Sequence, residues 1–278
     1  MIRAALALAT IRLKGLSESP RLDAEILLAH LYGWSRAQLI TRDEQPLSAE
    51  RASDYEQLLT RRGTGEPVAY LIGYRDFWTS RFAVGPGVLV PRPETELLVE
   101  IALEWLIDHP QPRLLDLGTG CGAVGLSIAL ARPEACVDLV ERSAPALAMA
   151  ATNRAGLGAK NARLLAGSWF APIGEARYDV ILANPPYIDP NDPHLAAPTL
   201  RHEPLEALVA EEAGLADLRW IAGQAPRHLL PGGRLLMEHG HDQGGAVRQM
   251  LKTAGFRSPG TYRDLAGRER ATGGALGD

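Results

Sequence analysis

Residues 114–122 have the sequence Leu-Leu-Asp-Leu-Gly-Thr-Gly-Cys-Gly, and this stretch decides the fold. Its apolar start predicts a buried strand, and the apolar run at 123–131 predicts a helix directly after it. Glycines between a strand and a helix let the backbone turn tightly and approach a ligand, while the helix N-terminus offers free N–H groups. The spacing is G-x-G-x-G, which differs from the G-x-G-x-x-G of dinucleotide-binding loops. The candidate loop residues are Gly118, Thr119, Gly120, Cys121 and Gly122.

Two acids accompany this loop. Asp116 lies two residues before the first glycine, where a carboxylate suits a cationic amine or sulfonium better than a pyrophosphate. Glu141 ends the next predicted strand, and an acid there can accept hydrogen bonds from both hydroxyls of a ribose. Taken alone, Glu141 could equally be a solvated carboxylate paired with Arg142. Together with the glycine loop, the ribose role is the better interpretation.

Strands and helices alternate beyond residue 91. This alternation predicts a doubly wound, mostly parallel α/β sheet, in which ligands bind beyond the carboxyl ends of the strands. One helix is expected at 94–107. The predicted strands are 113–116, 137–141, 162–166, 178–183 and 233–238.

The first 66 residues have a helical pattern. Ser19 is a candidate N-cap, Pro20 suits the first helical position, and Gly33 ends the helix. A second helix is expected at 48–62, with Ala52, Tyr55 and Leu59 facing inward. We therefore expect a small all-helical domain at 1–66, which looks more like a protein-docking module than a nucleic-acid-binding domain.

Residues 67–90 have short β-like runs at 68–71, 81–84 and 88–90, separated by glycines and a proline. This pattern predicts a β-hairpin linker at 67–90, and the α/β domain then covers 91–278.

The strand at 178–183 continues directly into Asn184, Pro185, Pro186 and Tyr187. Two prolines remove two donors and leave carbonyls free to face a ligand, while the Asn adds an acceptor and the Tyr an aromatic face. This set suits a planar NH2 group. If the Asn184 oxygen and the Pro185 carbonyl accept its two hydrogens, the nitrogen lone pair can aim at an electrophilic methyl group, and these bonds strengthen as charge builds on nitrogen. The alternative is a rigid turn with a core-facing Tyr.

The composition excludes several classes of protein. With 278 residues, of which 46% are hydrophobic and 22% charged, the chain is typical of an ordinary folded protein. The net charge is -4, and residues 1–90 hold 11 bases and 10 acids, which argues against nucleic-acid binding. The two cysteines and the His239–His241 pair offer no metal-ligand set, so we expect no metal. Without a cleavage site or a membrane-spanning run, we expect a cytoplasmic protein that does not bind membranes.

At these residues the chain resembles the class I S-adenosylmethionine-dependent methyltransferases, and within them the release-factor glutamine N5-methyltransferases of the PrmC/HemK family. The resemblance runs nearly end to end. Asn-Pro-Pro-Tyr alone is shared with enzymes that methylate amino groups of DNA and RNA. The sharper markers are Val-Pro-Arg-Pro-Glu-Thr-Glu at 90–96 and the helical N-terminal domain; further matches are 65–73, 77–78, 201–208 and 238–240.

The resemblance implies a Rossmann-like, seven-stranded sheet and the cofactor S-adenosyl-L-methionine, which leaves as S-adenosyl-L-homocysteine. It implies that the methyl group goes to the side-chain amide N5 of the Gln in the Gly-Gly-Gln loop of peptide chain release factors. The glycine loop would hold the methionine part, Glu141 the ribose and Trp169 the adenine, while residues 184–187 would hold the substrate amide. The helical domain would contact the release factor, and we expect a monomer with no direct contact to nucleic acid.

Three positions depart from the family pattern. Residue 141 is Glu where the family more often has Asp, and Ser168 precedes Trp169 where Asp is usual. The Gly-rich tail after Arg270 predicts a weak last strand.

Three alternatives remain at this point. One is a ribosomal-protein glutamine methyltransferase, against which the helical N-terminal domain and residues 77–78 speak. Another is a DNA or RNA amino-methyltransferase, which the net charge disfavours. The last is a non-catalytic cofactor-binding protein, which the intact Asn184 and Tyr187 disfavour.

Overall fold

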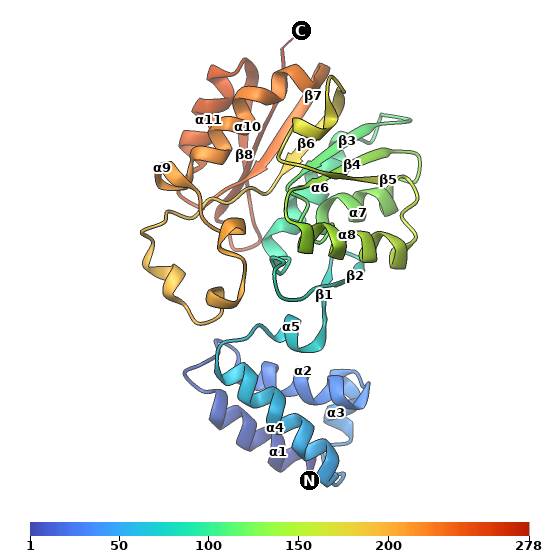
Figure 1. The fold of residues 1–278 in the computed structure, drawn as a ribbon, viewed down its shortest axis with the longest axis vertical. Helices are drawn as coiled ribbons and strands as arrows, with labels where there is room; N and C mark the ends of the chain where they lie inside the picture. The colour runs from blue at the N-terminus through green and yellow to red at the C-terminus, as the bar shows by residue number, and fades with distance from the viewer. Residues whose placement is uncertain (278) are drawn as a thin grey trace. The chain divides into compact units, whose positions relative to one another are not determined.

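The computed structural model describes residues 1–277, which fold into two compact units (Figure 1). The first unit consists of Met1–Tyr74 together with Pro193–Glu203, and is helical. The second consists of Arg75–Asp192 and the chain from Pro204 onward, and contains the large sheet. None of the helices in the described part of the chain combines the length and the apolar character needed to cross a membrane.

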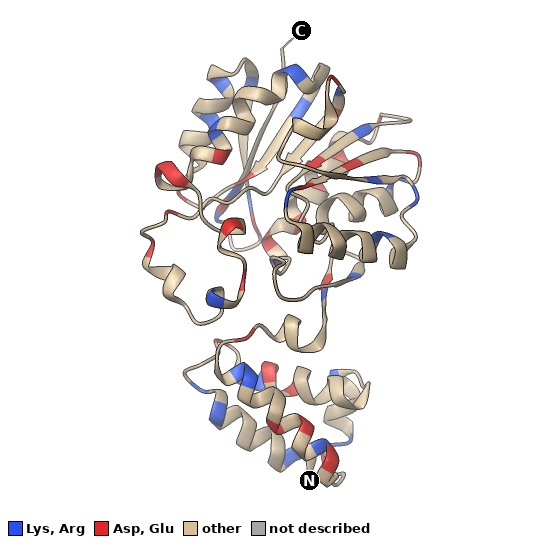
Figure 2. Cartoon of the chain, viewed as in Figure 1, with Lys and Arg blue, Asp and Glu red and all other residues tan. Residues whose placement is uncertain are grey.

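The helical unit is built from five α-helices around one apolar core. The expected ends of the second helix are confirmed, since Ser19 is its N-cap, Pro20 its first residue and Gly33 its left-handed C-cap. Basic and acidic residues are interspersed along the helices of this unit (Figure 2). Its helices are α1 (Ile2–Leu13), α2 (Pro20–Tyr32), α3 (Arg36–Thr41), α4 (Ala49–Gly63) and α5 (Val68–Ile72), with the short η3 (Pro193–Ala196) and η4 (Leu200–His202).

One inward position of α4 was predicted wrongly. Tyr55 and Leu59 are buried as expected, and the Tyr55 hydroxyl donates to the Ala24 carbonyl at 2.9 Å. Ala52, however, is exposed, and the buried stripe continues with Arg62 instead. Arg62 is buried because it forms an ion pair inside the unit, in which its Nε donates to Asp23 Oδ2 at 2.8 Å.

Two of the three β-like runs in the linker region are also predicted wrongly. Residues 68–71 lie in α5, for which Pro67 is the N-cap and Gly73, at φ 81°, the C-cap. A short apolar run cannot be distinguished from one buried helical turn by its pattern alone. Residues 88–90 belong to no strand of the described chain, although Val88 and Val90 are buried. The two-stranded sheet is instead formed by β1 (Tyr74–Phe77) and β2 (Ser80–Ala83).

The large sheet has seven strands in the order β5-β4-β3-β6-β7-β9-β8, which confirms the expected doubly wound, mostly parallel α/β fold. The first five strands in this order, β5, β4, β3, β6 and β7, run parallel to one another. Strand β9 pairs antiparallel with both β7 and β8. All five predicted strands are present, although β7 begins four residues early. The strands are β3 (Arg113–Leu117), β4 (Cys136–Glu141), β5 (Ala162–Ala166), β6 (Tyr178–Ala183), β7 (Leu229–Glu238), β8 (Phe256–Arg263) and β9 (Glu269–Leu276).

The expectation of a weak last strand is wrong, because β9 is eight residues long and is paired along both edges. Its glycines reflect close packing. A Cβ on Gly273 would lie 2.6 Å from the Leu235 carbonyl oxygen and 2.7 Å from the ring of Trp105. Only a residue without a side chain fits between β7 and the helix that carries Trp105.

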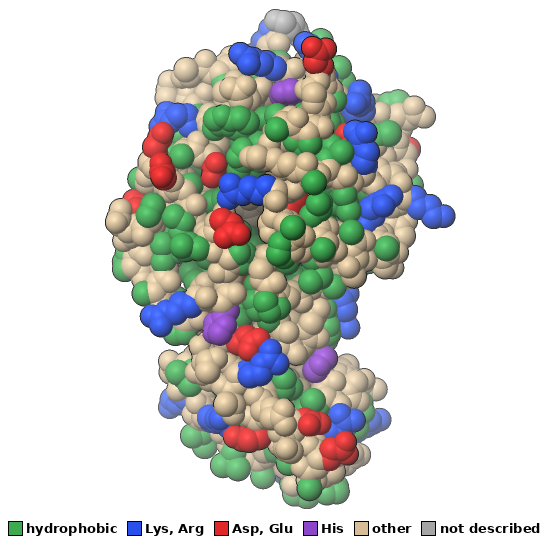
Figure 3. Space-filling model, in the orientation of Figure 1, with side chains coloured by type: hydrophobic (Ala, Val, Ile, Leu, Met, Phe, Trp, Pro, Cys, Tyr) green, Lys and Arg blue, Asp and Glu red, His purple; other side chains and the backbone are tan. Residues whose placement is uncertain are grey.

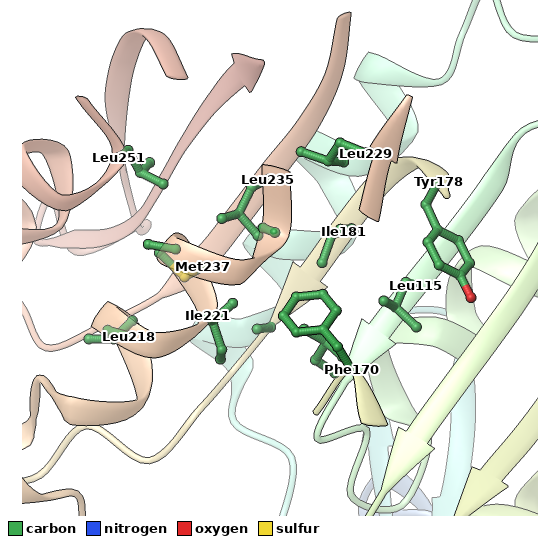
Figure 4. Close-up of a cluster of buried hydrophobic side chains, with 14 of the residues drawn as sticks. Leu115, Phe170, Tyr178, Ile181, Leu218, Ile221, Leu229, Leu235, Met237 and Leu251 are labelled. Carbon is green, nitrogen blue, oxygen red and sulfur yellow. The ribbon is translucent and has the colours of Figure 1, made fainter. Parts of the chain in front are cut away.

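Helices pack on the sheet and enclose its core. Figure 4 shows Leu115 and Ile181 near Phe170, and Met237 near Ile221 and Leu218, all within one cluster of buried hydrophobic residues. The helix predicted at 123–131 is confirmed, and that at 94–107 is present as a 3₁₀ turn followed by an α-helix. These elements are η1 (Pro93–Thr95), α6 (Glu96–Trp105), α7 (Ala123–Ala131), α8 (Ala144–Leu157), η2 (Ala171–Ile173), η5 (Leu205–Ala207), α9 (Glu211–Gly214), α10 (Ala216–Gln224), η6 (Ala225–His228) and α11 (Gly244–Thr253).

The order of the sheet also fixes where a ligand can bind. Strand β3 lies between β4 and β6, so the chain leaves β3 on one side for β4 and returns on the other for β6. The loops that follow β3 and β6 diverge at this point and open a crevice at the carboxyl ends of the strands.

Candidate active site

A cavity lies at the carboxyl ends of β3, β4 and β6. It brings together most of the residues singled out in the sequence, from four separate loops. The predicted residues that line it are Gly118, Thr119, Gly120, Cys121, Glu141, Trp169, Asn184 and Pro186. Gly122, Pro185 and Tyr187 do not line it. Thr95, Asp116, Arg142 and Glu206 do, as does the loop before η1.

The glycine loop has the backbone geometry that its composition predicts. Gly118, Gly120 and Gly122 have φ values of 68°, 60° and 89°, a region that side chains disfavour. A Cβ on Gly118 would lie 3.2 Å from the Trp169 ring, so this glycine lets the tryptophan close over the loop. The loop is tied to the neighbouring strand by a hydrogen bond of 3.0 Å from the Thr119 N–H to the Val140 carbonyl.

Gly125 is a loop-supporting residue that the sequence analysis missed. It lies in the first turn of α7, where a Cβ would come within 2.1 Å of the Leu139 side chain and 2.9 Å of Asp116 Oδ2. Its N–H donates to the same carboxyl oxygen at 3.0 Å. A glycine inside an apolar helix, three residues after the last glycine of the loop, was the available signal for this close approach.

Asp116 holds the glycine loop through buried hydrogen bonds. Its side chain is 3% exposed, and Oδ2 accepts hydrogen bonds from the Thr119 hydroxyl at 2.6 Å and from Gly125. Burial raises the pKa of Asp116 to about 6, although these two donors oppose the rise. The carboxyl therefore stabilises the loop and also presents negative charge to the cavity at neutral pH.

Glu141 is buried, which disfavours its interpretation as a solvated carboxylate. Oε2 accepts from the Gly120 N–H at 2.9 Å, and Oε1 accepts from the Ser143 N–H at 2.7 Å. Arg142 does not neutralise it, and instead donates to the Glu206 carbonyl at 3.1 Å. Since each carboxylate oxygen has two lone-pair sites, each keeps one for a ligand hydroxyl. This arrangement can hold a pair of adjacent hydroxyls.

Trp169 forms one wall of the cavity. Its backbone has a φ of 48°, which is rare for a residue with a bulky side chain, and the ring lies against Gly118. Ser168, next to it, is exposed and also lines the cavity. A flat aromatic wall beside an acid that can accept from two hydroxyls suits a nucleoside.

The Asn-Pro-Pro-Tyr segment begins where β6 ends, and its two polar side chains have different surroundings. Asn184 lines the cavity, and its Nδ2 donates to the Thr95 hydroxyl at 3.2 Å. Tyr187 packs against the core, where its hydroxyl donates to Glu238 Oε1 at 3.1 Å. Tyr187 therefore faces the core, as the alternative of a rigid turn predicted. Asn184, in contrast, lines the cavity. Gln243 Nε2 holds the Tyr187 carbonyl at 3.0 Å.

Thr95, Glu238 and Gln243 are partners that the sequence analysis assigned no role. Thr95 and Glu238 lie within stretches that marked the family resemblance, and this was the only signal available for them. Their contacts join residues 89 and 51 positions apart, which no local pattern reveals.

Neither the histidines nor Cys121 adds a reactive group to the cavity. His239 is fully buried and bonds through its two ring nitrogens to Gly240 O at 2.8 Å and Thr272 Oγ1 at 2.7 Å. Within residues 1–277, no group of three His, Cys, Asp or Glu side chains is placed to hold a metal ion. Burial raises the pKa of the Cys121 thiol to about 12, so this thiol stays protonated.

Comparison with known proteins agrees with this geometry. The family described as "Methyltransferase small domain" matches residues 94–203, and that described as "PrmC N-terminal domain" matches residues 4–73. A 16S rRNA methyltransferase from T. thermophilus, solved in complex with AdoMet and guanosine, shares the fold at 20% identity with a TM-score of 0.54. That match covers 73% of this chain and 49% of the other. The fold and the site define a class I methyltransferase.

Two curated relatives narrow the class to a family. The release factor glutamine methyltransferase of Bordetella pertussis is 50% identical over 258 residues, which cover 92% of this chain and 95% of the relative. The enzyme of the same name from Escherichia coli is 45% identical over 256 residues, covering 92% of each chain. The chain belongs to the release factor glutamine methyltransferase family, which confirms the resemblance found in the sequence.

Proposed function

We propose that this chain transfers a methyl group from S-adenosyl-L-methionine to the side-chain amide nitrogen of the Gln in the Gly-Gly-Gln loop of peptide chain release factors. One observation carries the proposal. Asn184, which suits a planar NH2 group, lines the same cavity as the glycine loop and Glu141, which suit a nucleoside. Donor and acceptor of the methyl group can therefore meet in one cavity, which removes most of the entropic cost of bringing them together.

The cofactor is assigned to the walls of this cavity. The two free lone-pair sites of Glu141 fit the ribose hydroxyls, and the Trp169 ring fits a flat adenine face. The positive-φ glycines leave room for the methionine part, and the ionised Asp116 carboxylate favours a cationic centre nearby. When bound, S-adenosyl-L-methionine supplies an electrophilic methyl group on a positively charged sulfur.

The substrate amide is assigned to Asn184 and the Pro185 carbonyl. Their oxygens would accept the two amide hydrogens, free the nitrogen lone pair from conjugation, and bind more strongly as positive charge develops on nitrogen. Transfer would form the C–N bond and break the bond between the methyl group and sulfur, and the nitrogen would then release one proton to solvent water. Tyr187 is not its acceptor, because the hydroxyl donates to Glu238 and burial raises its pKa above the usual range.

We assign to the helical unit the contact with the body of the release factor. Residues of both charge signs are interspersed along the helices of this unit, and on the face shown in Figure 3 basic and acidic side chains are likewise interspersed among apolar ones. A mixed surface of this kind fits a protein partner better than the phosphate backbone of a nucleic acid. We further propose that the enzyme acts as a monomer in the cytoplasm, where it meets its substrate.

The test is to supply labelled S-adenosyl-L-methionine with a release factor, with ribosomal proteins and with DNA or RNA in turn. We expect label in the release factor, and expect it to be lost when the Gln of the Gly-Gly-Gln loop is changed to Ala. Label in ribosomal proteins alone would favour the ribosomal-protein alternative. Label in nucleic acid alone would overturn the proposal.

The residue assignments have their own test. We expect Asn184→Ala to abolish transfer while the dissociation constant of S-adenosyl-L-methionine changes little. Turnover comparable to that of the wild type would mean that the amide is held elsewhere.

A further inference from the structure

The Asn-Pro-Pro-Tyr segment is held at its last residue by an amide side chain from a distant part of the chain. Gln243 Nε2 donates to the Tyr187 carbonyl at 3.0 Å and to the Ala213 carbonyl at 3.3 Å. Gln243 Oε1 accepts from the Gly240 N–H at 2.8 Å. Because a backbone N–H can only donate, this last bond fixes the orientation of the amide. Both N–H groups of Gln243 therefore face carbonyls.

Gln243 itself has a firm support. It is the N-cap residue of α11, and its partner Gly240 follows the end of β7 by two residues. Both elements contribute to the core of the sheet, β7 through Met237 and α11 through Val247. The amide of Gln243 is therefore fixed relative to the sheet.

A left-handed turn closes on the same carbonyl. Glu212, Ala213 and Gly214 have φ values of 55°, 56° and 80°, and the first two carry side chains that disfavour this region. A Cβ on Gly214 would lie 2.1 Å from the Tyr187 carbonyl oxygen, so the two backbones touch. Strained backbone of this kind persists only where its surroundings impose it, and it is concentrated at functional sites. Gln243 binds the turn and the Tyr187 carbonyl together.

The other end of the segment is fixed by the sheet. Ala183, the last residue of β6, pairs with Leu117 on β3 and with Met237 on β7. Between Ala183 and Tyr187 each proline has a fixed φ and also restricts the residue before it. Such a stiff stretch cannot absorb a shift at one end. If Tyr187 moved, the Pro185 carbonyl would turn with it.

We propose that Gln243 is a positioning residue for methyl transfer. By holding the Tyr187 carbonyl, it keeps the Asn184 side chain and the Pro185 carbonyl at the separation that the two hydrogens of a substrate amide require. It acts through the segment rather than by contact with the substrate. The inference rests on the proposed role of Asn184 and Pro185 in holding this amide.

The first test changes the donors of Gln243 in the full-length enzyme, with a release factor as substrate. Gln243→Glu keeps the shape and the acceptor for the Gly240 N–H, but at about pH 8 its carboxylate has no hydrogen to donate to Tyr187. We expect kcat to fall about tenfold, as for the loss of roughly one hydrogen bond in the transition state. The fall is partial because Ile188, the next residue, keeps its own backbone bonds.

The matched control is Gln249→Glu, which adds the same charge on the exposed face of α11 and should retain the wild-type kcat. In Gln243→Glu we expect KM for the release factor and the dissociation constant of S-adenosyl-L-methionine to stay close to those of the wild type. A merely structural role would lower the Tm and leave the kcat of the folded fraction unchanged, which would contradict the inference.

The second test approaches the same carbonyl from the left-handed turn. Gly214→Ala places a Cβ against the Tyr187 carbonyl while Gln243 is intact, and we expect kcat to fall again. Gly158→Ala is its control, because Gly158 has a similar φ of 72° but nothing within 4 Å of an added Cβ. If Gly214→Ala does not fold, Gln243→Glu decides the question alone.

The outcomes separate this inference from the proposed function. If Asn184→Ala is inactive while Gln243→Glu retains the wild-type kcat, the positioning role is wrong and the proposed function stands. If Asn184→Ala is itself active, both fail. An equal loss of kcat in Gln243→Glu and Gln249→Glu would also overturn the inference, because the added charge would then explain the loss.

Discussion

At the scale of the residue, ionisation of the buried Asp116 carboxyl lowers the stability of the fold, although the same carboxyl accepts hydrogen bonds from Thr119 and Gly125. Burial raises its pKa to about 6 from an ordinary 3.8, so the folded chain binds a proton more tightly than the unfolded chain does. Stability from this group is therefore fully present below pH 4 and is lost as the pH rises through 6. The difference amounts to roughly 3 kcal/mol at most.

Asp116→Asn removes this dependence because the amide carries no charge to desolvate. We expect the variant to have the higher Tm at pH 7, and the difference to shrink toward zero at pH 4. Its affinity for S-adenosyl-L-methionine should fall, since the negative charge is gone. Thermal unfolding of both proteins between pH 4 and 8 checks this, and a constant difference in Tm across that range would contradict it.

Glu141 can be tested by changing the number of acceptor oxygens. Glu141→Gln has one acceptor for the Gly120 and Ser143 N–H groups, and we expect it to raise the dissociation constant of S-adenosyl-L-methionine about tenfold or more. Glu141→Asp keeps both acceptors and is the control. Titration calorimetry measures both, and equal affinity in the Gln variant would remove Glu141 from the ribose site.

At the scale of the element, close packing rather than flexibility explains the glycine inside α7. A side chain at Gly125 would overlap the Leu139 side chain on β4, whereas one at Gly223 in α10 would meet nothing within 4 Å. We therefore expect Gly125→Ala to destabilise the chain by about 1–3 kcal/mol, the usual cost of overpacking. Gly223→Ala is the matched control and should be neutral or slightly stabilising. Equal values of Tm for the two variants would contradict this explanation.

The elements also show what the sequence can and cannot predict. The strands from β3 to β6 follow from apolar runs that end at acids, glycines or the Asn184 motif, because buried parallel strands have continuous apolar sequences. Helix α5 could not be predicted, since five apolar residues fit one helical turn as well as a strand. The pairing of Thr95 with Asn184 was equally out of reach, because it depends on the tertiary approach of η1 to the end of β6.

At the scale of the whole molecule, the segment after Tyr187 leaves the sheet and then returns to it. Its two ends are joined by hydrogen bonds from the Ile188 N–H to the Leu208 carbonyl at 2.9 Å and from the Ala210 N–H to the Ile188 carbonyl at 3.1 Å. Its middle, Pro193–Glu203, packs within the helical unit. On its return the chain lines the cavity with Pro204, Glu206 and Ala207.

A substitution at Gly65 tests how the segment Pro193–Glu203 is held in place. It has a φ of 96°, and a Cβ there would lie 2.6 Å from the Pro198 carbonyl oxygen. We expect Gly65→Ala to loosen residues 193–203 and to speed their hydrogen exchange. Gly63→Ala, where nothing lies within 4 Å, is the control and should leave exchange unchanged. Identical exchange in both variants would show that the segment is held by other contacts.

The passage of the chain between the two units limits how the enzyme can be cut into parts or joined with parts of a relative. Because Pro193–Glu203 belongs to the helical unit, the chain passes between the two units at three points along the sequence: after Tyr74, after Asp192 and after Glu203. Cutting after Tyr74 would leave the segment without the helices on which it packs. A chimaera that takes its helical unit from one relative and its sheet from another must therefore exchange two separate stretches of the gene, and in natural descent these stretches are expected to change together.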